Sequence, residues 1–334
     1  MKITVFGAGA VGGHVAARLG AGAATAGIEV AAVARGAQLA AITERGITLW
    51  LGDECRSARI RATDRPETLG VQDVVFVTMK SSVLPEAAEA MAPLVGPETS
   101  VVFAMNGIPW WYLYRCPENG VPRPDLSRLD PSGALQRSIG FERVIGCIVN
   151  SMNEVVEPGV IRNPPGARNR FTLGEPDGTV SRRVEAISAA FDRAGLAAPV
   201  TSDIRSDIWD KLVRNLSTSP ICSLTGEPIG VIGRHDELLE VAKSLMNEGL
   251  ATAKAHGITL DIDFARAYGP RPSSGHKSSM LQDLERDRPP EIDGILTAVQ
   301  AFARAAGLPT PYLDTVTALV IEKARRAGLY PAAA

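Results

Sequence analysis

A glycine-rich turn near the start of the chain is the residue pattern that points most directly to chemistry. It has the spacing G-x-G-x-x-G and follows an apolar run at residues 2–6. Where such a turn joins a strand to a helix, the first glycine permits the tight turn and the second lets backbone N–H groups approach a pyrophosphate. The third glycine allows the helix to pack closely against the strand. A glycine turn without a ligand is the alternative, but this position favours dinucleotide binding. The predicted cofactor-binding residues are Gly7, Ala8, Gly9, Ala10, Val11 and Gly12.

The end of the second apolar run indicates which dinucleotide is bound. An NAD-binding protein typically has Asp or Glu there, which binds the ribose 2′-hydroxyl. This chain has Ala32-Val33-Ala34-Arg35 instead. A guanidinium matches a 2′-phosphate in charge and in bidentate geometry. A solvated surface arginine is the alternative, but with the glycine motif upstream the residues predict NADPH.

Two polar residues follow later apolar runs, where parallel strands meet a ligand crevice. Lys80 could reach the cofactor phosphates or a substrate carboxylate, and Asn106 could bind a ribose or hold a catalytic group. A lysine at a strand end and an Asn-Gly turn explain the same residues equally well.

The elements that must position these residues alternate along the first 200 residues. Apolar runs separated by helical patterns predict βαβ units and a largely parallel sheet. The expected strands are 2–6, 28–34, 73–79, 100–104 and 144–150, with 159–162 and 170–174 as a short antiparallel addition. Helical periods take over beyond about residue 203. The predicted fold is therefore α/β, with a Rossmann-type dinucleotide-binding domain at 1–202 and an all-helical domain at 203–334.

A segment rich in Pro, Gly, Asp and Ser, residues 116–136, is expected to project from the first domain as a loop. In the second domain, Ile208, Leu212 and Leu216 form one apolar arc of a helix. Lys211 and Asn215 are four residues apart and share a face at the edge of this arc. A solvated lysine is the usual reason for such a pattern, so the pattern alone does not assign catalysis.

Composition excludes several classes of function. With 45% hydrophobic residues, 22% charged residues and a net charge of −2, the chain lacks the basic excess of nucleic-acid or membrane-surface binders. Its four cysteines have no CxxC spacing and no histidine cluster nearby, which predicts neither a metal site nor a disulfide framework. No targeting leader is evident, so a cytoplasmic location is expected. A homodimer remains open.

The sequence resembles the ketopantoate reductases (2-dehydropantoate 2-reductases) over nearly its whole length. The resemblance rests on the glycine motif, Arg35, MK at 79–80, NG at 106–107, EPGVI at 157–161, DIWDKLVRN at 207–215 and SSMLQDLERDRPPEID at 278–293. The last two blocks are specific to this family.

The resemblance implies reduction of a 2-keto acid with NADPH, foremost ketopantoate to pantoate for coenzyme A synthesis. It implies that Lys211 is the catalytic acid and that Asn215, Ser279 and Glu291 bind substrate. It also implies that Asn106 lies near the nicotinamide, and that Arg35 and Lys80 bind the cofactor. None of the four histidines has a paired carboxylate signature, so Lys211 is preferred as the acid.

Two departures keep other functions open. Ser219 stands where the family often has a second asparagine, and the NG motif is followed by Trp110 and Trp111. The two indoles could narrow the substrate pocket or could be ordinary packing under the loop. The alternatives are a sister dehydrogenase for another 2-keto or 3-hydroxy acid and a non-catalytic NADPH-sensing protein. A sensor would not need Lys211, Asn215 and Glu291 together.

Overall fold

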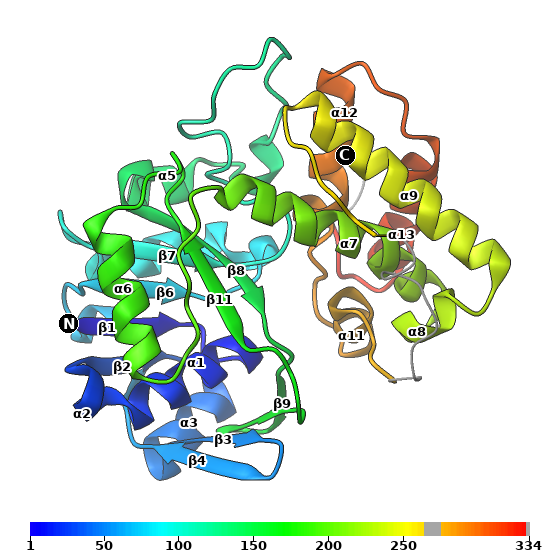
Figure 1. The fold of residues 1–334 in the computed structure, drawn as a ribbon. Helices are drawn as coiled ribbons and strands as arrows, with labels where there is room; N and C mark the ends of the chain where they lie inside the picture. Colours follow the sequence, from blue (N-terminus) through cyan, green and yellow to red (C-terminus); the bar gives the residue numbers. More distant parts are fainter. Residues whose placement is uncertain (264–274, 332–334) are drawn as a thin grey trace. The chain divides into compact units, whose positions relative to one another are not determined.

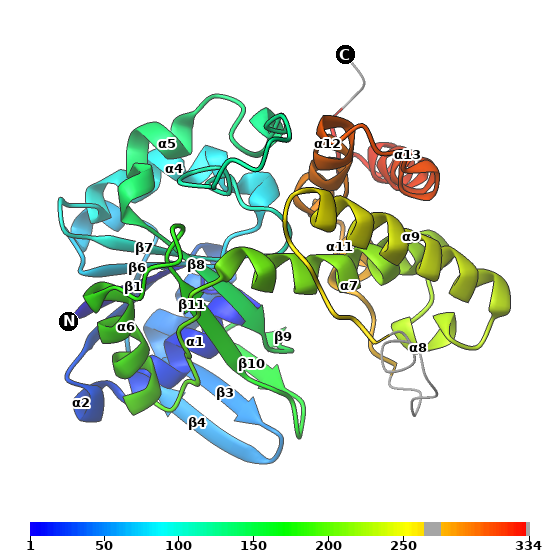
Figure 2. The same cartoon turned by 45° about the horizontal axis from the view of Figure 1, so that its top comes forward.

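The structure is a computed structural model that describes residues 1–263 and 275–331, and its contacts divide the chain into two compact units. Unit 1 comprises Met1–Met105 and Ser132–Ile204, and unit 2 comprises Asn106–Pro131 and Arg205–Ala334 (Figures 1 and 2). The division after Ile204 lies close to the expected boundary at 202. The expectation that the 116–136 loop belongs to the first domain is wrong for residues 116–131, which lie in unit 2.

The main sheet of unit 1 has seven strands in the order β11-β8-β7-β6-β1-β2-β5. Neighbours are parallel except for β11, which runs antiparallel to β8. Runs of Val, Ile and Phe suit such strands because helices cover both faces of a parallel sheet. The strands are β1 (Lys2–Phe6), β2 (Glu29–Val33), β5 (Arg61–Thr63), β6 (Val74–Val77), β7 (Ser100–Ala104), β8 (Val144–Asn150) and β11 (Arg170–Gly174).

Strand register brings three candidate segments to one edge of this sheet. Phe6 at the end of β1 lies opposite Val33 at the end of β2 and Val77 at the end of β6. The segments that follow these three residues therefore leave the sheet at the same edge. In parallel sheets this carboxyl edge is where ligands bind.

A second sheet of four strands was not expected. Its order is β4-β3-β10-β9, with β3 (Ile47–Leu51), β4 (Glu54–Ala58), β9 (Glu154–Glu157) and β10 (Val160–Asn163). The Gly52-Asp53 link between β3 and β4 is a recognisable hairpin signal that the sequence analysis missed. The prediction that 159–162 and 170–174 form one addition is wrong for β10, which pairs in parallel with β3. That pairing joins segments about a hundred residues apart, so no local pattern reveals it.

Helix α1 (Ala10–Ala21) packs against strands of both sheets. A Cβ atom on Gly13 would lie 2.6 Å from the Ile161 side chain, and one on Gly20 would lie 2.6 Å from Ile60. Glycine at these positions therefore lets the neighbouring chain approach α1 closely. The other helices of unit 1 are α2 (Ala23–Ala26), α3 (Gly36–Arg45), α4 (Ala88–Met91), α5 (Ala134–Ile139) and α6 (Arg182–Arg193). Short 3₁₀ turns occupy Pro66–Thr68, Ser81–Val83, Pro85–Ala87, Ala92–Leu94 and Phe141–Arg143 in unit 1, and Ser127–Leu129 in unit 2.

Unit 2 is helical, as predicted, and contains no strand in its described part. Its helices are α7 (Ile204–Thr225), α8 (Ile229–Ile232), α9 (Asp236–Ala255), α11 (Ser279–Glu285), the π-helical η7 (Asp293–Thr297), α12 (Ala298–Ala305) and α13 (Pro311–Arg326). Residues 264–274 lie outside the described residues. Across 1–263 and 275–331, no helix has both the length and the apolar character needed to cross a bilayer.

Aromatic packing explains why residues 106–131 belong to unit 2. The rings of Tyr112 and Phe302 pack edge-on, with their centroids 5.3 Å apart. The Tyr112 hydroxyl accepts a hydrogen bond of 2.8 Å from Trp209 Nε1. The Arg205 guanidinium donates to the Tyr112 carbonyl at 2.9 Å. Trp111 is only 1% exposed and Trp110 is also buried, which supports ordinary packing as the role of the two indoles.

Candidate functional site

The glycine loop, residues 7–12, is held by groups from three neighbouring elements. The N–H groups of Gly7 and Ala8 donate to the carbonyl of Val33 at 3.1 and 3.2 Å. Thr78 Oγ1, just after β6, donates to the Gly7 carbonyl at 2.5 Å. Gln38 Nε2, from α3, donates to the Ala8 carbonyl at 2.7 Å. These contacts fix the loop from the side of the protein.

The loop has the features that a dinucleotide pyrophosphate requires. A Cβ atom on Gly12 would lie 2.0 Å from the Gly7 carbonyl oxygen, so no side chain fits there. A Cβ atom on Gly9 would meet nothing within 4 Å, so the loop borders open space at that point. In the described structure α1 begins with no side-chain cap and no acidic residue in its first turn. Its first N–H groups are therefore available to an anion.

Arg35 is the residue for which the sequence predicts recognition of a 2′-phosphate. It follows β2, is the N-cap residue of α3 and is exposed. No acidic side chain of the described residues forms an ion pair with it. Lys80 follows β6 at the same sheet edge and is partly buried. Strand register thus places the starts of the segments that carry Arg35, Lys80 and the glycine loop at one edge of the sheet.

Gln38 is a residue that the sequence analysis missed. Besides its bond to the Ala8 carbonyl, its Oε1 accepts a hydrogen bond of 2.9 Å from the Gly159 N–H. One amide side chain therefore links the glycine loop to the turn between β9 and β10. A glutamine one turn into a helix belongs to no motif, so only the fold reveals this role.

A buried polar network joins α1 to the segment that follows β8. His14 Nδ1 lies 2.7 Å from Asn153 Oδ1, which also accepts from Asn163 Nδ2 at 3.0 Å. Asn163 and Asn169 exchange hydrogen bonds of 2.9 Å, and Asn169 accepts from Ser151. Because Asn153 Oδ1 acts as an acceptor, the proton of the neutral imidazole is assigned to Nδ1. The network ties residues 151–153, at the carboxyl end of β8, to the helix that begins at the glycine loop.

Burial lowers the pKa of His14 from 6.5 to about 4, although its hydrogen bond with Asn153 acts in the opposite direction. Arg18 adds a smaller repulsion that also lowers the pKa. His14 Nε2 is buried and has no hydrogen-bond partner among the described residues. The ring is therefore neutral near pH 7 and serves as a structural group rather than as an acid.

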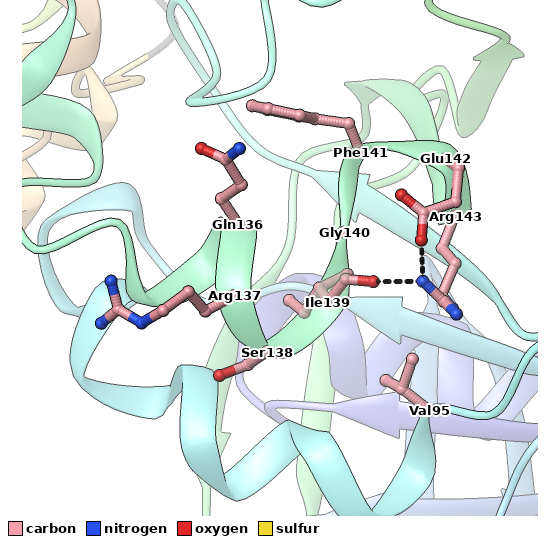
Figure 3. Close-up of a pocket in the computed structure, with 9 residues that line it drawn as sticks. All are labelled: Val95, Gln136, Arg137, Ser138, Ile139, Gly140, Phe141, Glu142 and Arg143. Atoms are coloured by element: carbon pink, nitrogen blue, oxygen red, sulfur yellow. Dashed lines mark hydrogen bonds and ion pairs between the residues drawn. The ribbon is translucent and has the colours of Figure 1, made fainter.

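A surface hollow of about 410 Å³ in unit 1 is not the cofactor site (Figure 3). Val95 and residues 136–143 line it. The guanidinium of Arg143 donates to the Gly96 and Ile139 carbonyls at 2.9 and 3.0 Å. The hollow lies beside the starts of β7 and β8, whereas the glycine loop follows the end of a parallel strand. It is therefore at the edge of the sheet opposite the glycine loop.

In unit 2, α7 has the arrangement that its helical wheel predicts. Lys211 and Asn215 are half-buried on one face. Arg214 is exposed, and its Nη2 lies 2.9 Å from Asp210 Oδ1 in an ion pair. Ser219 continues the face of Lys211 and Asn215 and is buried. The apolar arc is also buried, at Ile208, Leu212 and Leu216.

The structure brings Asn106 and Glu291 into direct contact. Asn106 Nδ2 donates to Glu291 Oε2 at 2.9 Å, and Glu291 is only 6% exposed. The next residue, Gly107, has a φ of +76°, and a Cβ atom there would lie 2.4 Å from the Gly294 backbone. The Ile108 N–H donates to the Gly294 carbonyl at 2.7 Å. The Asn-Gly turn is thus fixed against η7. Asn106, which is expected near the nicotinamide, lies beside Glu291, which is expected to bind the substrate.

Ser279 stands apart from these contacts. It is exposed and is the first residue of α11, while the buried Ser278 caps that helix by accepting from the Leu281 N–H at 3.3 Å. No hydrogen bond within 1–263 and 275–331 joins Ser279 to Asn215. Ser279 is thus the first residue of α11, and its contact with substrate stays a prediction.

Comparison with known proteins places the chain among the relatives that its motifs suggest. The family described as "Ketopantoate reductase PanE/ApbA" matches residues 3–109, and "Ketopantoate reductase PanE/ApbA C terminal" matches 203–324. A 2-dehydropantoate 2-reductase of Mesorhizobium japonicum is 43% identical over 99% of this chain and 100% of its own length.

Solved structures agree with this similarity. A protein from Ralstonia solanacearum MolK2, proposed to be a ketopantoate reductase, has a TM-score of 0.86 at 36% identity and covers 98% of this chain and 99% of its own. D-mandelate dehydrogenase with NADH and anilino(oxo)acetate has a TM-score of 0.79 at 20% identity, over 98% of this chain and all of its own, and shares the fold alone. The 43% identity over the full length and the two matching family regions agree, so this chain belongs to the ketopantoate reductase family.

Proposed function

We propose that this protein reduces 2-dehydropantoate to pantoate with NADPH. The observation that carries the proposal is the full-length similarity to the Mesorhizobium 2-dehydropantoate 2-reductase. The local geometry supports it, because unit 1 offers an anion-binding loop with an exposed arginine and unit 2 offers a lysine and an amide on one helix face.

The residues of unit 1 would hold the cofactor. The N–H groups at the start of α1 bind the pyrophosphate, Arg35 binds the 2′-phosphate and Lys80 contributes positive charge at the same edge. When bound, NADPH supplies the hydride from nicotinamide C4. Thr78 and Gln38 keep the glycine loop in the shape that receives the pyrophosphate.

The residues of unit 2 would handle the substrate. As the keto carbon is reduced, negative charge develops on its oxygen, and the Lys211 ammonium stabilises that charge and donates the proton. Asn215 and Ser279 offer hydrogen bonds that orient the keto acid. The Glu291 carboxylate would repel the carboxylate of the substrate, so it is suited to accept a hydrogen bond from the substrate hydroxyl. Asn106 holds Glu291 in place through the 2.9 Å hydrogen bond.

A different 2-keto acid is the second candidate substrate. Ser219 lies on the face of Lys211 and Asn215 and is shorter than the asparagine that the family often has there. A shorter side chain leaves more room for a substituent beside the keto group.

Initial rates of NADPH oxidation with a panel of 2-keto acids test the proposal. The panel is ketopantoate, 2-ketoisovalerate (which lacks the hydroxyl), pyruvate and phenylglyoxylate. We expect kcat/KM for ketopantoate to exceed the others by at least about tenfold, because a site that binds a substrate hydroxyl discriminates strongly against analogues without one. Preference for another acid would support the second candidate. NADPH binding without turnover of any acid would support a sensing protein instead.

The role of Arg35 predicts the cofactor preference. Arg35→Ala should weaken NADPH binding by about 10- to 100-fold, because a charge-assisted hydrogen bond contributes about 1.5–3 kcal/mol, and it should leave NADH binding unchanged. Fluorescence titration of both dinucleotides measures the effect. Arg45→Ala, at the exposed far end of the same helix, is the matched control. Equal affinities of the unmodified protein for NADPH and NADH would contradict the assignment.

A further inference from the structure

Distant parts of unit 2 converge on the carboxylate of Asp293. Tyr330 Oη donates to Asp293 Oδ1 at 2.7 Å, and Thr297 Oγ1 donates to the same oxygen at 2.8 Å. Arg128 Nη1 donates to Tyr330 Oη at 3.1 Å and lies 3.7 Å from Asp293 Oδ1. We call Arg128, Asp293, Thr297 and Tyr330 the Asp293 cluster. It joins the 116–131 loop, the start of η7 and the chain segment after α13.

Tyr330 is the connecting group of the cluster. Its hydroxyl accepts a hydrogen bond from Arg128 and donates one to Asp293, so it must keep its proton to bridge the two. Burial raises the pKa of Tyr330 to about 12, and the hydrogen bond to Asp293 acts in the same direction. The bridge therefore persists over the whole physiological pH range.

The ion pair alone does not explain the cluster. The Arg128 side chain is 67% exposed and that of Asp293 is 30% exposed, so their attraction is screened by water and contributes little to stability. What the cluster provides is geometry, because it fixes the position of the first residue of η7 from two sides.

The geometry of η7 matters because it is adjacent to Glu291. Asp293 is two residues after Glu291, and Gly294 accepts the Ile108 N–H at 2.7 Å while Glu291 accepts from Asn106. A π-helical turn is a rare conformation that occurs mostly as single turns, often at functional sites. The Asp293 cluster supplies tertiary contacts that hold this turn.

We propose that Asp293 is a positioning residue which, together with Tyr330 and Arg128, holds η7 so that Glu291 keeps its orientation toward the substrate. The inference rests on the proposed role of Glu291 in binding the keto acid. It also assigns a function to two segments outside the helices of unit 2, the 116–131 loop and the residues after α13.

Tyr330→Phe is the central test, because it removes one hydroxyl and leaves the ring in place. We expect KM for the keto acid to rise about tenfold while kcat changes less than about threefold, since Lys211 and the hydride donor are untouched. The Kd of NADPH should stay unchanged. Tyr312→Phe, on the exposed tyrosine of α13, is the matched control and should behave like the unmodified protein.

A double-mutant cycle shows whether the hydroxyl acts through Glu291. In the Glu291→Ala background, Tyr330→Phe should have no further effect on KM, because the group that it positions is gone. An undiminished effect in that background would overturn the inference.

Spectrophotometric titration of the phenols is independent of activity: Asp293→Asn should lower the pKa of Tyr330 from about 12 toward the ordinary value.

The outcomes separate this inference from the proposed function. An active protein whose Tyr330→Phe variant keeps the KM of the parent overturns the positioning role alone. A parent protein that reduces no keto acid overturns the proposed function and, with it, this inference.

Discussion

Lys211→Ala is expected to lower kcat for keto-acid reduction by on the order of 10² to 10⁴, which corresponds to about 3–5 kcal/mol of barrier. The reason is that the developing alkoxide loses both its stabilising charge and its proton donor. Lys211 is half-buried at the edge of the apolar arc of α7, whose core positions are Ile208 and Leu212. Its truncation leaves no core cavity, so the variant should fold and bind NADPH.

Two further variants make the test of Lys211 specific. Lys211→Arg should lose almost as much activity, because a guanidinium keeps the charge but does not release a proton near neutral pH. Lys243→Ala replaces another half-buried lysine in the middle of a helix, α9, and should leave kcat unchanged. Steady-state and single-turnover kinetics measure the hydride step, with NADPH binding as the control for folding. A loss of less than about tenfold in Lys211→Ala would assign the proton to another group, such as His276.

The second large effect concerns His14 and the stability of unit 1. Burial lowers the pKa of His14 to about 4, whereas the ring in the unfolded chain has the ordinary value of 6.5. Between these two values the unfolded chain binds more protons than the folded protein. The stabilisation is therefore complete above pH 6.5 and is lost as the pH falls toward 4. The free energy of unfolding should decrease by up to about 3 kcal/mol over this range.

The physical cause lies in the surroundings of the ring. Nδ1 is engaged with Asn153, and the second nitrogen, Nε2, is buried without a partner among the described residues. Protonation would place a charge and an unpaired N–H at Nε2. The centroid of the neighbouring Phe171 ring lies 5.9 Å from that of His14, and this ring offers no acceptor comparable to water. The neutral ring is the form that the fold accommodates.

Urea unfolding at pH values from about 7.5 to 4.5 measures the effect in the parent protein and in His14→Gln. The variant should show a smaller loss of stability on acidification, because glutamine does not titrate. His235→Gln, on an exposed histidine, is the matched control and should follow the parent. NMR titration of the histidine C2 protons gives the pKa of His14 directly and does not depend on the variant folding. A value near 6.5 for that ring would refute the prediction.

The glycine loop, Arg35 and the helix of Lys211 could be predicted from the sequence because their signals are local. A G-x-G-x-x-G turn, an arginine after a strand and an apolar arc repeating every three to four residues depend only on neighbours along the chain. Five of the six parallel strands of the main sheet were predicted for the same reason, because strands buried on both faces need continuous Val, Ile and Phe runs. The sixth, β5 (Arg61–Thr63), was not predicted, because it is short and lacks such a run. The roles of individual substrate-binding residues came from the family resemblance rather than from such patterns.

Tertiary structure alone decided how distant residues meet. Asn106 and Glu291 are 185 residues apart, and Arg128 and Tyr330 are 202 apart, so no periodicity links them. The same holds for Gln38, which reaches Gly159 across 121 residues. Local sequence determines which face of a helix or strand is apolar. It does not determine which other segment covers that face, and burial by that segment sets the pKa of His14 and of Tyr330. Local patterns therefore predict the candidate cofactor loop and the lysine helix, whereas the fold shows which side chains hold them in place.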